Sequence, residues 1–133
     1  MNPYYRAIAQ RANHCCEYCK APEVVFNFPF EVEHITPISR QGSNEEANLA
    51  LACRSCNLRK GNRIGGVPSG ANTEVRFFHP RKDLWGEHFQ VSAESGEIAG
   101  RTPIGEVTLE SLAMNSLAQV AARQLWIRLG LFP

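Results

Sequence analysis

The cysteines are the residues of this 133-residue chain with the clearest capacity for chemistry. Four of them form two C-x-x-C pairs, Cys16 with Cys19 and Cys53 with Cys56. This spacing lets both thiolates of a pair reach one metal ion, and two pairs supply the four sulfurs of a tetrahedral Zn²⁺ site. The odd total of five cysteines argues against a disulfide framework. We therefore expect a structural zinc ion that joins two distant stretches of the chain.

The same residues allow other interpretations of the cysteine pattern. A single C-x-x-C pair can be a redox dithiol, but such a dithiol usually sits at a helix N-terminus in a βαβ pattern, which neither pair shows clearly. The sequence also leaves open whether the fifth cysteine, Cys15, or the neighbouring His14 replaces one of the four thiolates. An ordinary surface histidine is the commoner explanation for His14.

Short elements must position these cysteines. Apolar residues at helical spacing predict a helix before the first pair, and β-branched and aliphatic runs predict two strands before the second. Glycine can adopt the left-handed conformation that ends a helix after the second pair. The expected elements are a helix at 4–14, strands at 31–35 and 49–52, a polar loop at 36–46, and a helix at 55–60 that ends near Gly61.

Three sequence stretches between and after the cysteine pairs carry a second pattern. They read Glu33-His34-Ile35-Thr36-Pro37, then Asn48-Leu49, then Cys53-Arg54-Ser55-Cys56-Asn57-Leu58-Arg59-Lys60. These stretches predict a strand, a loop, a second strand and a helix, with a C-x-x-C pair on either side of the two strands. This arrangement resembles the HNH nuclease family. The resemblance implies an α+β fold with a small ββα-metal core stapled by the four-cysteine zinc site. Local sequence patterns in the second half of the chain add a C-terminal layer of one hairpin and a helix.

The resemblance also implies a role for each residue of the pattern. His34 matches the general base that takes a proton from the attacking water, a task suited to an imidazole because it changes charge near neutral pH. Asn48 matches the asparagine that holds the histidine loop in position. Glu33 and Asn57 match the two ligands of a catalytic divalent cation beside the scissile phosphate.

Two positions depart from the commonest family pattern. Glu33 stands where aspartate is usual, and Asn57 stands where a second histidine often appears. Both side chains still offer oxygen, and the loss of an imidazole favours hard cations, so we expect Mg²⁺ or Mn²⁺ at the catalytic site. Adjacent residues of a regular strand face opposite sides, so the strand must bend for Glu33 and His34 to address one phosphate.

Positive charge is local in this chain, whose net charge is only +1. Four cations lie within ten positions of the second cysteine pair without an intervening acid: Arg54, Arg59, Lys60 and Arg63. By the resemblance they would neutralise flanking phosphates of a nucleic acid. The alternative is that they merely form the solvated face of a short helix.

The second half of the chain offers packing information and little chemistry. We divide the chain into a zinc-stabilised nuclease module at 1–64 and an α+β extension at 65–133 that packs on it, together one compact domain. A flexible connection is expected at 65–72, then a short helix at 79–88 and a hairpin of 89–93 with 97–100. The final helix would pack through a stripe formed by Leu117, Val120, Ala121, Leu125 and Leu129. His79 and His88 are expected to pack this layer.

Composition sets the remaining expectations. With 44% hydrophobic and 20% charged residues the chain has the composition of a soluble globular protein. The N-terminal sequence lacks the apolar run of a signal peptide, and no stretch approaches membrane-spanning length, so we expect a cytoplasmic protein without a membrane partner.

The leading hypothesis is an endonuclease that hydrolyses DNA phosphodiester bonds with weak sequence specificity, because no recognition helix is apparent. The alternative is a zinc-stabilised nucleic-acid-binding module without cleavage activity, and a redox dithiol protein is a third candidate. Monomer and homodimer both remain open. Restriction, phage defence, packaging, mobile elements and repair all use this module, and the sequence does not choose between them.

Overall fold

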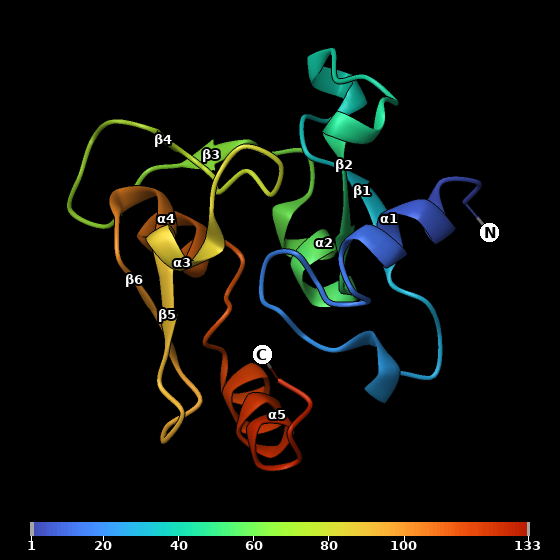
Figure 1. Cartoon of the computed structure of the whole chain (residues 1–133). Helices are drawn as coiled ribbons and strands as arrows, with labels where there is room; N and C mark the ends of the chain where they lie inside the picture. The colour runs from blue at the N-terminus through green and yellow to red at the C-terminus, as the bar shows by residue number, and fades with distance from the viewer. Residues whose placement is uncertain (1, 133) are drawn as a thin grey trace.

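The structure is a computed structural model that describes residues 2–132. Met1 and Pro133, at the outer ends of the two predicted units, lie outside the described residues. The first half contains two short α-helices, one β-hairpin and three turns of 3-10 helix (Figure 1). In chain order these are α1 (Tyr5–Arg11), η1 (Glu23–Val25), β1 (Glu31–His34), η2 (Ile38–Arg40), η3 (Glu46–Asn48), β2 (Leu49–Ala52) and α2 (Arg54–Lys60).

The β1–β2 hairpin is the frame of the first half. The two strands are antiparallel, with Glu31 opposite Ala52 and His34 opposite Leu49. All four residues of β2 are buried, because α1 covers this strand in the core. Helix α2 follows β2 directly and packs against β1, so strand, loop, strand and helix occur in the predicted order. The α+β fold class is confirmed, including a buried four-cysteine cluster.

The second half contains two further hairpins and three helices, several of which depart from the predicted positions. They are β3 (Gly65–Gly66), β4 (Val75–Arg76), α3 (Trp85–His88), β5 (Phe89–Val91), β6 (Ile98–Gly100), α4 (Pro103–Ser111) and α5 (Leu117–Arg128).

The segment expected to be a flexible connection begins with a strand. Gly65 and Gly66 pair with Arg76 and Val75, so only the residues between the strands form the loop. A Cβ atom on Gly65 would lie 2.6 Å from the carbonyl oxygen of Val75, so glycine here permits close approach of two backbones. The expected helix at 79–88 is also shorter, since only Trp85–His88 is helical.

Helix α4 is an element that the sequence patterns did not predict, although its start carries a recognisable signal. Thr102 is the N-cap and its side chain accepts a hydrogen bond from the Gly105 amide at 3.0 Å, and Pro103 occupies the first helical position. The helix packs against β6 and β4. A Thr-Pro pair at a helix start is therefore the local cue that would have predicted it.

The prediction that α5 packs through its leucine stripe is wrong, because a different face of the helix is buried. Leu117, Leu125 and Leu129 are 92%, 55% and 69% exposed. The fully buried side chain of this helix is instead Arg123, whose guanidinium donates to the carbonyl oxygens of Gly96 at 2.8 Å and Met114 at 2.7 Å. These two backbone carbonyls thus determine which side of α5 faces inward.

Both halves of the chain contribute to one hydrophobic core. Buried residues of the first half, among them Tyr18 and Leu51, belong to the same cluster as Phe78, Phe89 and Met114 of the second half. The Trp85 indole also donates a hydrogen bond of 2.8 Å to the Tyr18 carbonyl. The division at residues 64 and 65 remains a prediction. Among residues 2–132, no helix combines the length and apolar character needed to cross a bilayer.

We predict that Arg123→Ala lowers the free energy of unfolding by about 2–4 kcal/mol, because it removes two charge-assisted hydrogen bonds and leaves a void. Chemical denaturation followed by circular dichroism measures the change. Arg128→Ala on the same helix is the matched control, since an exposed side chain there should shift stability by less than about 0.5 kcal/mol. Equal effects of the two substitutions would contradict the assignment of Arg123 as the anchor of α5.

Candidate metal centre and catalytic site

Four sulfur atoms meet in the interior of the first half. Cys16, Cys19, Cys53 and Cys56 place their Sγ atoms within 4.8 Å of one another, and none of the four residues is more than 3% exposed. The Sγ atoms of Cys19 and Cys53 lie 3.7 Å apart. A tetrahedral Zn²⁺ with bonds of about 2.3 Å separates its sulfur ligands by roughly 3.8 Å. The four residues therefore fit a structural zinc ion without rearrangement.

Electrostatics inside this cluster favour a bound cation. Burial opposes ionisation of Cys16, but hydrogen bonds from the other three thiols outweigh it and hold the pKa of Cys16 well below its usual value. The hydrogen bond to Cys16 in turn raises the pKa of Cys19 and of Cys56 well above theirs. Without a cation only part of the cluster can ionise, whereas a divalent ion allows all four thiolates to form.

The two alternative ligands lie outside the cluster. Cys15 is half-buried and its Sγ lies 3.5 Å from the carbonyl oxygen of Asn13. The imidazole Nδ1 of His14 lies 2.7 Å from a carboxylate oxygen of Glu23. Glu23 also accepts hydrogen bonds from the Tyr5 hydroxyl and the Phe30 amide, so His14 belongs to a separate polar cluster.

His34 is the last residue of β1 and its side chain is partly exposed. Its Nε2 lies 2.7 Å from the side-chain oxygen of Asn44 in the loop that follows. When Nε2 carries the proton and donates to this oxygen, Nδ1 is left with a free lone pair. In that tautomer the Nδ1 lone pair is available to accept a proton, as a general base requires. Nothing in the sequence pattern pointed to Asn44.

Asn48 fastens the loop that carries His34. Its side-chain oxygen accepts from the Thr36 amide at 2.8 Å, and its side-chain nitrogen donates to the carbonyl oxygens of Thr36 at 2.9 Å and Ser43 at 2.8 Å. Gly42 completes the arrangement, since a Cβ atom there would collide with the Thr36 carbonyl. These contacts join the two ends of the loop, which is the geometry that the predicted role of Asn48 requires.

Glu33 occupies a different environment from the one expected of a catalytic metal ligand. It is 5% exposed, accepts a hydrogen bond from the Tyr18 hydroxyl, and pairs with the Lys60 ammonium at 3.1 Å. Burial raises the pKa of Glu33 although Lys60 and Tyr18 both favour its charged form. The Glu33 carboxylate is therefore directed into the core, on the opposite side of the strand from the adjacent His34.

The carboxylate that contacts Asn57 belongs to Glu31. The side-chain nitrogen of Asn57 lies 2.5 Å from Glu31 Oε2, and Arg54 Nη1 lies 3.4 Å from Glu31 Oε1. Glu31 and Glu33 are two residues apart on β1 and so face the same side, toward α2. The alternation of β1 is the signal that could have identified Glu31, whereas the family position points only to Glu33.

The four predicted phosphate-binding cations divide into two groups. Arg54, Arg59 and Arg63 are exposed, and one guanidinium nitrogen of Arg63 donates to the Arg59 carbonyl. Lys60 is 2% exposed, and its ammonium also donates to the backbone carbonyls of His34 at 3.2 Å and Ile35 at 3.0 Å. The prediction that Lys60 binds a phosphate is wrong, because its ammonium is buried and contacts Glu33 and the carbonyls of His34 and Ile35.

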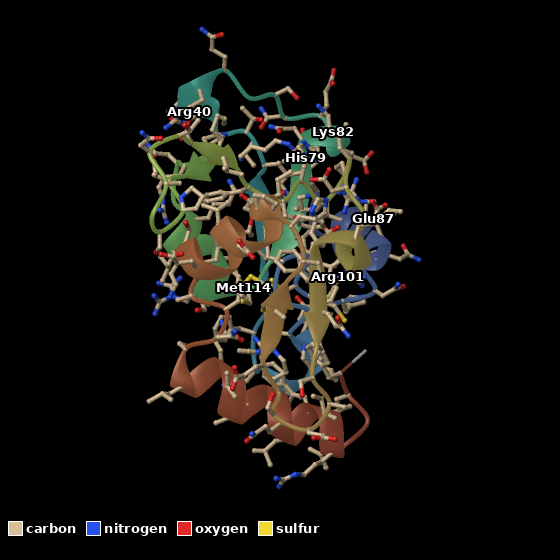
Figure 2. The ribbon with its side chains drawn as sticks, turned by 90° about the vertical axis from the view of Figure 1, so that its left-hand side faces the viewer. Arg40, His79, Lys82, Glu87, Arg101 and Met114 are labelled. Carbon is tan, nitrogen blue, oxygen red and sulfur yellow. The ribbon has the colours of Figure 1, made fainter. Side chains whose placement is uncertain are left out.

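The loop with His34 and helix α5 lie at opposite ends of the molecule. Arg40, in the turn after β1, is near one end together with His79 and Lys82, and α5 crosses the other end (Figure 2). Helix α2 and the cysteine cluster lie between these ends, so they connect the two regions (Figure 1).

A β-hairpin and a helix joined by a buried four-sulfur cluster define the class of the first half, a ββα module of the kind that a structural metal stabilises. Residues 16–63 match the model of the HNH endonuclease family. The chain therefore contains an HNH endonuclease domain, and this family implies a nucleic acid substrate. No curated protein and no solved structure was found to match the chain.

We predict that the purified protein holds about one zinc ion per chain and that Cys56→Ser abolishes this stoichiometric binding, since a hydroxyl is a poor replacement for a buried thiolate. Plasma mass spectrometry measures the metal content. Cys15→Ser is the matched control, because Cys15 is no member of the cluster and its removal should leave the zinc in place. Loss of zinc in the Cys15 variant as well would contradict this ligand set.

Proposed function

We propose that the protein is a metal-dependent endonuclease that hydrolyses DNA phosphodiester bonds. The observation that carries this proposal is the fixed imidazole of His34, bound through Nε2 to Asn44 at 2.7 Å in a loop that Asn48 fastens. The match of residues 16–63 to the HNH endonuclease family supports the same chemistry.

His34 acts as the general base. Its Nδ1 accepts the proton of a water molecule as the water oxygen attacks phosphorus, and the hydrogen bond from Nε2 to Asn44 stabilises the imidazolium that forms. Lys60 holds the backbone carbonyls of His34 and Ile35 from the side of α2. Asn48 holds Thr36 from the loop side, so the histidine is supported from both directions.

Oxygen side chains of α2 and β1 hold a divalent cation. The predicted pair is Asn57 with Glu33, but the carboxylate that faces Asn57 is Glu31, so we propose Glu31 and Asn57 as the ligands of this chain. When bound, Mg²⁺ or Mn²⁺ would stabilise the negative charge that develops on the phosphate and the leaving oxygen. The Asn57 amide must turn its oxygen outward for this, because its nitrogen now contacts Glu31.

Arg54, Arg59 and Arg63 neutralise phosphates of the bound nucleic acid. Contacts of this kind carry no sequence information, so we expect weak sequence specificity. A cytoplasmic location is part of the proposal, since a reducing compartment keeps four cysteines available as thiolates.

A second candidate function, a nucleic-acid-binding module without cleavage activity, is favoured by one observation. The ion pair between Glu33 and Lys60 occupies the carboxylate that the family pattern assigns to the catalytic cation. Cleavage therefore requires either the use of Glu31 or the opening of this buried pair. Both carboxylates lie on the side of β1 opposite to His34, so the chain must also bend at the end of β1 to bring the cation and the imidazole to one phosphate.

We predict that the protein nicks supercoiled plasmid with Mg²⁺ or Mn²⁺ and that His34→Ala slows nicking by roughly 10²–10⁴-fold, the contribution typical of a general base. His88→Gln is the matched control, because its side chain can keep the hydrogen bond to Thr102 in the second half and should leave the rate unchanged. Plasmid binding without nicking by the unaltered protein would establish the second candidate instead. Equal nicking by the unaltered protein and His34→Ala would indicate a contaminating nuclease.

The two carboxylates of β1 can be separated by substitution. We predict that Glu31→Gln weakens Mn²⁺ binding roughly tenfold or more, as loss of a charged ligand should, while Glu33→Gln leaves it unchanged. Glu33→Gln should instead lower thermal stability, because it leaves the Lys60 ammonium buried without its partner. Isothermal titration of the zinc-loaded protein with Mn²⁺ measures the affinity. Weakened binding in Glu33→Gln alone would restore the family pair of Glu33 and Asn57.

A further inference from the structure

A groove lies between helix α2 of the HNH domain and helix α5 at the C-terminal end of the described chain. It has a volume of about 290 Å³ and is lined by residues of α2, α5 and the segment before each of them, with Phe26 from the loop after η1. Ligand pockets span roughly 300–1,000 Å³, so this groove has room for one planar ring system. The function proposed above uses two arginines that line this groove but not its aromatic wall.

The charge of the groove matches a phosphate backbone. Arg54 and Arg59 both line it, and the part of the lining that lies within residues 2–132 contains no carboxylate. Ser55 and Arg59 are four residues apart and share the face of α2 that looks toward α5, where Ser55 accepts a hydrogen bond of 3.1 Å from Gln119. Asn57 lies on the other side of the helix, toward β1.

The opposite wall of the groove is aromatic. Trp126 of α5 and Phe26 have ring centroids 6.3 Å apart with their planes tilted by 54°, and Phe26 packs edge to face on Phe30. Phe26 is 38% exposed, and Trp126 is only partly buried. A ring that enters the groove can therefore contact an aromatic side chain while arginine side chains flank its entrance.

We propose that this groove binds one unpaired nucleotide of the DNA strand, with the base against Trp126 and the adjoining phosphates on Arg54 and Arg59. Aromatic side chains stack on any base and arginines neutralise its backbone, which is the common arrangement in proteins that bind single strands. A paired base cannot enter, because both of its neighbours in the duplex and its partner strand block access to the ring. The groove thus directs the enzyme toward single-stranded, nicked or branched DNA.

The distance from the catalytic site suits this arrangement. The seven residues of α2 span about 10 Å at a rise of about 1.5 Å per residue, and Lys60 at its far end contacts the backbone of His34. A base in the groove would therefore belong to a nucleotide further along the strand than the cleaved bond. This substrate preference rests on the proposed nuclease function.

A second copy of the chain is a poorer occupant. The exposed leucines of α5, Leu117, Leu125 and Leu129, could pair with an apolar surface, but the groove places two arginines where a second copy would have to bury them. Arg54 already pairs with Glu31 at 3.4 Å, but a second copy would remove both guanidinium groups from water, whereas a phosphate compensates their charge.

The test measures anisotropy of a labelled single-stranded oligonucleotide and of the duplex with the same sequence, with zinc-loaded protein in the His34→Ala background so that neither is cleaved. We expect Trp126→Leu to weaken single-strand binding roughly tenfold, within the range of one lost stacking contact, and duplex binding by less than about twofold. Leu125→Ala, on the exposed face of the same helix, is the matched control and should change neither. Equal weakening of both substrates, or of neither, would overturn the proposal.

Two further measurements keep the result interpretable. Arg59→Gln should reduce the salt dependence of single-strand binding by about one unit in the slope of log K against log salt, without a change in zinc content. An unchanged slope would count against the groove even if Trp126→Leu fails to fold. Sedimentation that shows a dimer lost in Trp126→Leu would assign the groove to a second copy. Plasmid nicking by the protein with His34 intact tests the proposed function separately, since it does not require the groove.

Discussion

Attraction between four thiolates and one cation is the constraint on which the arrangement of this protein depends. Cys19 and Cys53 are 34 positions apart in the sequence, yet the sulfurs of both pairs gather within 4.8 Å in the buried interior. Four negative charges could not share such a volume without a metal ion. Cys53 is the N-cap of α2 and Cys56 directly precedes Asn57, so an ion that joins the two pairs would also anchor the start of this helix.

A chain of polar contacts carries this constraint from the cysteine cluster to His34. Tyr18 lies between the cysteines of the first pair, its hydroxyl donates to Glu33, Glu33 pairs with Lys60, and Lys60 donates to the carbonyls of His34 and Ile35. Replacement of a buried ion pair by well-packed apolar residues is often neutral or stabilising, so stability alone does not explain these charges. The position of these charged residues offers a better explanation, because Lys60 fixes the backbone at the point where β1 ends and the loop begins.

The sequence predicted most of the first half and much less of the second, and particular residues show why. Ligand spacing is short-range, so the two cysteine pairs could be assigned from local sequence alone. The environment of Glu33 could not, because it depends on Lys60 reaching across from α2. On α5 the leucine periodicity predicted the wrong face, since the carbonyls of Gly96 and Met114 attract Arg123 inward. Periodicity reports only which residues share a side of a helix, and the partner that covers the side comes from tertiary structure.

The second half supports the first through several polar contacts. Arg81 pairs with Glu17, whose other carboxylate oxygen accepts from the Leu51 amide, so the extension reaches the strand that precedes α2. Trp85 donates to the carbonyl of Tyr18 and thereby supports the segment that carries the first cysteine pair. Helix α5 then stands beside the N-terminal end of α2, with Gln119 bonded to Ser55. One end of α2 thus contacts the end of β1 and the loop after it through Lys60, and the other end contacts the extension through Ser55. A seven-residue helix with no stability of its own is held in place by the metal cluster and by these two contacts.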